Sequence, residues 1–124
     1  ANVPDDFSML CGDDPFIFSM LCSGGRGGIT ASSHVVTHAF VQMVEAVEQN
    51  DIARARSISE AMLPVCATLF AEPSPGVIKG VLHAQGRIST PSVRLPMTAA
   101  SASSVDVAVA AVKHAEEALT TILG

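Results

Sequence analysis

The sequence contains no tryptophan and no tyrosine, and its aromatic content is only 4%. Basic residues are also scarce, because seven lysines and arginines stand against twelve aspartates and glutamates, for a net charge of −5 at pH 7. Proteins that bind nucleic acid need a positive surface for the phosphates, and those that bind single strands add aromatic rings for base stacking. The composition therefore argues against a nucleic-acid partner.

Long hydrophobic runs are absent as well, since no stretch reaches the roughly 18 apolar residues of a membrane span. The apolar segment 16–22 is short and has no basic flank in front of it, so it does not fit a signal peptide. The only cysteines are Cys11, Cys22 and Cys66. An odd number of widely spaced cysteines is typical of free buried thiols in a reducing compartment. We therefore expect a cytoplasmic protein with no membrane partner.

Two short apolar segments, 7–11 and 28–31, are predicted strands, and each is followed by a loop and a helix-like stretch. Repeated strand–loop–helix units predict a parallel α/β fold, with its chemistry on the loops at the carboxyl ends of the strands. The 124 residues are too few for a (β/α)8 barrel, which needs roughly 250. Two parallel strands leave open edges, and the sequence starts at Ala1, so we expect a fragment or one half of a split chain.

Helical patterns dominate the rest of the chain. Predicted helices cover about 15–23, with Asp13 and Asp14 as candidate caps, and a second stretch that ends near residue 50. A third follows with Asp51 as its cap, and Pro64 predicts a kink or a local break in it. A short helix over about 75–85 precedes an ordered loop over 87–102, and Ser103 or Ser104 is expected to cap the last helix. The predicted organisation is two βα units over 1–50 and a helical region over 51–124.

Several segments carry a family resemblance when they are taken in order: LCGDD at 10–14, SGGRGGIT at 23–30, LFAEPSPGVIK at 69–79 and VRLPMT at 93–98. Together they resemble the C-terminal part of the dihydrodipicolinate synthase family, which are pyruvate-dependent class I aldolases related to N-acetylneuraminate lyase. The resemblance implies the last two βα units of a (β/α)8 TIM barrel followed by a C-terminal helical region. The segment at 93–98 favours the synthases over the sister aldolases.

The resemblance also implies an activity. The complete enzyme would form a Schiff base between pyruvate and a lysine, and would condense it with aspartate semialdehyde to 4-hydroxy-tetrahydrodipicolinate, in lysine (diaminopimelate) biosynthesis. It implies no cofactor and no metal. Members of the family are commonly tetramers, so a homo-oligomer is expected, and the apolar helix face over 16–20 could serve packing or subunit contacts.

Three residues are candidate substrate-binding residues by this resemblance. Backbone groups at Gly12 and Ile29 would line the pyruvate pocket, and Asp13 would lie near the second substrate. Glycine at the end of a strand lets a ligand approach the backbone closely. The alternative interpretation makes Gly12 a turn glycine, Ile29 a core residue and the two aspartates helix caps, and Asp14 is taken as structural in either case.

No catalytic residue is expected in this chain. Its only lysines are Lys79 and Lys113, and neither matches the Schiff-base lysine of the resembling family, which lies on an earlier barrel strand. The catalytic tyrosine of the family has no counterpart, because the chain has no tyrosine. The complete protein is therefore expected to need an N-terminal barrel portion, on the same or a companion chain, and this chain alone is expected to be inactive.

Other motifs are weak. His34 and His38 share a predicted helix face, but no glutamate lies between them in an HExxH pattern and no third zinc ligand is evident. The glycines at 24–28 follow a helix and precede a strand, which is the reverse of a phosphate-binding loop. Two alternatives to the synthase stay open: a sister pyruvate aldolase that acts on N-acetylneuraminate or a 2-keto sugar acid, and a non-catalytic helical assembly module.

Overall fold

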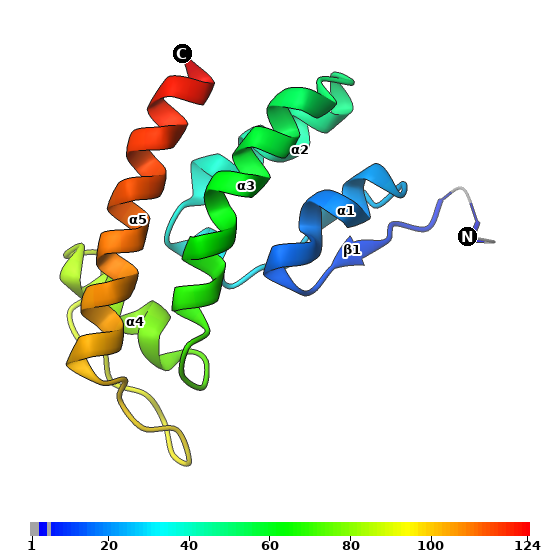
Figure 1. Ribbon diagram of the computed structural model, residues 1–124. Coiled ribbons are helices and arrows are strands. Elements are labelled where there is room, and N and C mark those ends of the chain that lie inside the picture. Colours follow the sequence, from blue (N-terminus) through cyan, green and yellow to red (C-terminus); the bar gives the residue numbers. More distant parts are fainter. Residues whose placement is uncertain (1–2, 5) are drawn as a thin grey trace.

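A computed structural model describes residues 3–4 and 6–124 of the chain (Figure 1). The described residues form two very short strands near the N-terminus, with one α-helix between them and four α-helices after them. In chain order the elements are β1 (Leu10–Cys11), the 3-10 turn η1 (Asp14–Phe16), α1 (Ile17–Cys22), β2 (Gly27–Gly28), the 3-10 turn η2 (Ser32–His34), α2 (Thr37–Glu48), α3 (Ile52–Leu69), α4 (Gly76–Ala84) and α5 (Ala102–Leu123).

The two strands pair in parallel, as the repeated strand–loop–helix pattern predicts. Leu10 pairs with Gly27 and Cys11 with Gly28, so each half of the N-terminal region is a βα unit. Both strands are shorter than predicted, since 7–9 and 29–31 lie outside the paired residues. Within the described residues each strand pairs only with the other strand, so each has one open edge. The result is helix-rich and consistent with a partial βα barrel.

The core is built around α3, whose buried face contacts α2 on one side and α5 on the other. Figure 1 shows α5 running alongside α3, with β1 and α1 across α3 from it. Buried alanines lie at these helix contacts, and their small side chains let the backbones approach closely: Ala39 and Ala46 of α2, Ala55 of α3, and Ala108 and Ala115 of α5. Residues from both sides of position 50 belong to this one cluster, and the domain boundary proposed there stays a prediction.

The predicted Asp51 cap is confirmed, and two helices end at glycines. Asp51 accepts a hydrogen bond from the Arg54 amide at 3.1 Å and caps α3. Gly24 and Gly86 follow α1 and α4 with positive φ angles of 96° and 70°, which glycine adopts without strain. These ends depend on residues close in sequence, which is why the pattern predicts them.

Two helix predictions differ in detail from the structure. The local break that Pro64 predicts is absent, because α3 continues through it from Ile52 to Leu69, while the alternative, a kink, stays a prediction. The cap of α5 is Ser101 rather than Ser103 or Ser104: its hydroxyl accepts from the Ser104 amide at 3.2 Å. Ser101 is held by Glu72, whose carboxylate accepts from its hydroxyl at 2.6 Å and from its amide at 3.1 Å. Among the described helices, none combines the length and apolar character required to cross a bilayer.

Candidate functional site

Gly12 and Ile29 lie side by side just beyond the carboxyl ends of the two strands. The Ile29 amide donates to the Cys11 carbonyl at 2.8 Å, which extends the parallel register by one step and brings Ile29 level with Gly12. Both residues are exposed, and the Ile29 side chain is 76% exposed. Ile29 is therefore not a core residue within this chain, and the pair forms an open surface where the loops of a βα fold carry chemistry.

Neither packing nor backbone strain requires glycine at position 12. Apart from its two chain neighbours, no residue has an atom within 4 Å of the place where a Cβ would stand, and Gly12 has no left-handed backbone. Gly28 is different, because an added Cβ would come 2.8 Å from the buried Ile17 side chain and 3.1 Å from the Cys11 carbonyl. Gly28 serves close packing inside the chain, whereas Gly12 leaves room for a group from outside it.

Asp13 is exposed next to Gly12, and its side chain does not cap the following turn. Its backbone carbonyl accepts from the Phe16 amide at 3.1 Å and from the Cys11 thiol at 3.2 Å. Asp13 therefore occupies the N-cap position of η1, as the alternative interpretation has it, but its side chain forms no capping hydrogen bond. These two bonds fix the backbone of Asp13 while its carboxylate stays at the open surface beside the strand ends.

Asp14 has a role that the sequence analysis missed. It is buried, with 3% of its surface exposed, and it does not cap its own helix. Its carboxylate instead accepts from the Ala31 amide at 3.1 Å and from the Ser32 amide at 2.5 Å, at the start of η2. The only available signal was an acidic residue just after a strand, and that pattern predicts a local cap rather than a contact 17 residues away.

A buried thiol lies beneath this connection. Burial raises the pKa of the Cys66 thiol to about 11; the nearby Asp14 carboxylate also raises it, while the Ser32 hydroxyl lowers it. The hydroxyl is close enough to affect that pKa, yet it forms no well-aligned hydrogen bond within the described residues. Cys66 therefore stays protonated near neutral pH and is a poor nucleophile. Cys11 is buried and Cys22 is exposed, so the expectation of three buried thiols is wrong for Cys22.

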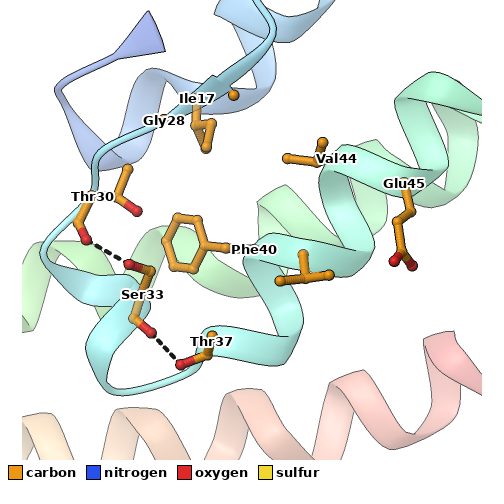
Figure 2. Close-up of a pocket in the computed structure, with 10 residues that line it drawn as sticks. Ile17, Gly28, Thr30, Ser33, Thr37, Phe40, Val44 and Glu45 are labelled. Atoms are coloured by element: carbon orange, nitrogen blue, oxygen red, sulfur yellow. Dashed lines mark hydrogen bonds between the residues drawn. The ribbon is translucent and has the colours of Figure 1, made fainter.

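A cavity of about 350 Å³ opens beside β2 and α2 (Figure 2). Figure 2 shows Phe40 and Val44 of α2 facing toward Thr30 and Ile17. Two of the three hydroxyls in its wall donate to backbone carbonyls, from Ser33 to Thr30 at 2.5 Å and from Thr37 to Ser33 at 2.6 Å. With those groups satisfied and a mainly apolar lining, the cavity suits the packing of an apolar segment better than the binding of a small anion.

Both lysines lie outside the strand ends. Lys79 of α4 donates to the Ser92 carbonyl in the long loop, and Lys113 is exposed on α5. His34 and His38 are both exposed, and the described residues contain no group of three histidine, cysteine or carboxylate side chains that could hold a metal ion. The structure thus brings together Gly12, Asp13 and Ile29 at the strand ends.

Comparisons with known proteins identify the family of the chain. The model of the dihydrodipicolinate synthetase family matches residues 1–115. The chain is 41% identical over 96 residues to 4-hydroxy-tetrahydrodipicolinate synthase 2 of Clostridium acetobutylicum, covering 77% of this chain and 34% of that protein. It is 40% identical over 97 residues to the 4-hydroxy-tetrahydrodipicolinate synthase of Listeria innocua, covering 78% of this chain and 33% of that one.

Solved structures show the same fold. The dihydrodipicolinate synthase of Thermotoga maritima superposes with a TM-score of 0.85 at 28% identity, over 90% of this chain and 37% of that one. The 4-hydroxy-tetrahydrodipicolinate synthase of Methylacidiphilum fumariolicum SolV gives a TM-score of 0.88 at 22% identity, over 97% and 40%. The chain spans about a third of the length of the curated relatives that it matches. From the family match and the shared fold, we conclude that this chain belongs to the dihydrodipicolinate synthetase family.

Proposed function

We propose that this chain forms the last two βα units and the C-terminal helical region of a (β/α)8 barrel enzyme, a 4-hydroxy-tetrahydrodipicolinate synthase. The enzyme condenses pyruvate with aspartate semialdehyde in the lysine (diaminopimelate) pathway. The observation that carries the proposal is the exposed pair Gly12 and Ile29 at the carboxyl ends of two parallel strands. Active sites of such barrels lie at that end of the strands. Membership of the family and the names of the similar synthases support the same activity.

In this proposal the chain binds and orients the substrates, and the covalent catalyst comes from elsewhere. A neutral lysine on an earlier barrel strand attacks the pyruvate carbonyl, water leaves, and the Schiff base loses a proton to become an enamine. The enamine carbon then attacks the aldehyde. Backbone groups at Gly12 and Ile29 form one wall of the pyruvate pocket, and the exposed Asp13 carboxylate lies beside the entering aldehyde.

The required partner is an N-terminal barrel portion, on the same or a companion chain. A two-stranded sheet is marginal by itself, and the strand region exposes Phe7, Met9 and Leu10. On the β2 side, the apolar cavity of Figure 2 has room for apolar side chains of a neighbouring βα unit, which would pair with the free edge and cover α2. A homotetramer in the cytoplasm is the expected assembly.

The proposal is tested by a steady-state assay of condensation between pyruvate and aspartate semialdehyde. The chain assembled with its N-terminal portion is compared with the chain alone. We expect turnover only from the assembly, because neither Lys79 nor Lys113 lies at the strand ends. Equal turnover by the chain alone would place the catalytic lysine within these 124 residues and contradict the proposal. Turnover with N-acetylneuraminate in place of the two substrates would favour the sister aldolases.

A further inference from the structure

The carboxylate of Asp14 joins the loop that follows β1 to the loop that follows β2. Its two oxygens accept from two consecutive amides, Ala31 at 3.1 Å and Ser32 at 2.5 Å. The side chain is 3% exposed and the Ser32 side chain is fully buried. A buried carboxylate is costly unless it is hydrogen-bonded, and these two amides supply the bonds. The two amides also obtain a hydrogen-bond acceptor in this way, because the first N–H groups of a helical turn have no partner within the turn.

This connection lies directly behind the candidate pocket wall. Gly12 precedes Asp14 by two residues, and Ile29 precedes Ala31 by two residues. The ladder between the two segments ends at the bond from the Ile29 amide to the Cys11 carbonyl. Beyond that bond, the Asp14 carboxylate is the next hydrogen-bonded link between the two loops. The β-ladder therefore fixes the backbone just before Gly12 and Ile29, and the Asp14 carboxylate fixes the backbone just after them.

We infer that Asp14 is a positioning residue for the pyruvate pocket: its buried carboxylate fixes the backbone of Gly12 relative to that of Ile29. The inference rests on the proposed function. Asp14 is not a catalytic residue, because both of its oxygens are occupied by amides and its side chain is buried away from the open surface. It acts through the two loops that it joins.

The test compares Asp14→Asn with the control Glu72→Gln in the chain assembled with its N-terminal portion. Asparagine keeps the shape but turns one acceptor into a donor that faces an amide. Glu72 is a suitable control because its carboxylate also accepts an amide at a helix start, that of Ser101, far along the chain from the strand ends. We expect both variants to lower the melting temperature. We expect only Asp14→Asn to raise the KM for pyruvate, by at least about tenfold, because a misplaced binding group can lower catalytic efficiency by up to roughly a hundredfold.

A second variant covers the case in which Asp14→Asn fails to assemble. Ala31→Pro removes one of the two donated amides and leaves the carboxylate in place, and the φ of −76° at Ala31 suits proline. It should raise the KM for pyruvate in the same direction. An unchanged KM in the folded variants, with a melting temperature that falls as in Glu72→Gln, would overturn the positioning role while the wild type remains active. A wild type that forms no reducible pyruvate adduct would instead remove the proposed function and this inference with it.

Discussion

At the scale of single residues, the glycines near the strand ends differ in how closely other side chains pack against them. Gly28 is required by its packing against Ile17, whereas Gly12 has empty space around it. The sequence pattern predicted Gly12 directly after the first strand, because an apolar segment ending in glycine is a local signal, but it placed Ile29 inside the second predicted strand, over 28–31. It could not predict that Ile29 is 76% exposed, since the amount of cover depends on which parts of the fold surround it.

The open space at Gly12 leads to a prediction for Gly12→Ala. An added methyl group meets no atom within 4 Å in this chain apart from those of its two chain neighbours, so the melting temperature should not fall. In the assembled enzyme the same methyl group stands in the pyruvate pocket and should raise the KM for pyruvate. Gly80→Ala is the reverse control, because its Cβ would come 2.4 Å from Val105; it should lose stability with KM unchanged. Equal KM values in both variants would remove Gly12 from the pocket wall.

The buried thiol of Cys66 makes stability depend on pH. Its folded-state pKa of about 11 lies above the ordinary value of 9.0, so between these values the folded protein holds a proton that the unfolded chain has lost. The free energy of unfolding should therefore fall as the pH rises from about 9 to 11. Denaturant melts across this range, with Cys66→Ala as the comparison, measure the effect. A slope that is the same in both proteins would exclude Cys66 as its source.

At the scale of elements, the predictions that hold are those with partners nearby in sequence. The Asp51 side chain accepts from the amide of Arg54, three residues later, and a glycine ends a helix through its own backbone conformation. The Asp14 link could not be predicted, because its partners lie 17 and 18 residues away on another loop. The cap of α5 was misplaced for a similar reason: several serines precede this helix, and the distant Glu72 selects Ser101 among them.

Replacement of the serines before α5 should show which of them is the cap. Ser101→Ala removes the acceptor of the Ser104 amide and the hydroxyl bound to Glu72, and should destabilise the protein by about 1 kcal/mol, the usual value for a lost cap. Ser103→Ala leaves that amide bond intact and should have a smaller effect. Thermal denaturation of the two variants measures the loss of stability, and a larger loss for Ser103→Ala would contradict the assignment of Ser101 as the cap.

At the scale of the whole molecule, the fold class followed from the repeated strand–loop–helix pattern, but the length of the strands did not. Segments 7–9 and 29–31 have the composition of strands, yet they lie outside the two assigned strands, and each strand has one neighbour in the described part of the chain. Strand length is set by the partners available, and a single chain of this size does not contain them. The helical core around α3 depends only on this chain, and its helices were predicted closely.

A surface valine provides a test of the assembly. Val41 of α2 is 47% exposed and lines the cavity beside β2, so Val41→Lys should leave the helices of this chain intact and weaken association with the N-terminal portion. Val107→Lys is the matched control, because Val107 is 59% exposed on α5, away from that cavity. Circular dichroism checks the helices, and size-exclusion chromatography of the mixed portions measures association. Equal weakening by the two changes would contradict the proposed contact.

The most direct test of the whole account traps the Schiff base. The assembled protein is incubated with pyruvate and reduced with borohydride, and the modified lysine is located by mass spectrometry of every polypeptide and its peptides. We predict one pyruvate adduct on a lysine of the N-terminal portion, with Lys79 and Lys113 unmodified. An adduct on Lys79 or Lys113 would contradict the division of roles between the two portions, and the absence of any adduct would contradict the proposed chemistry.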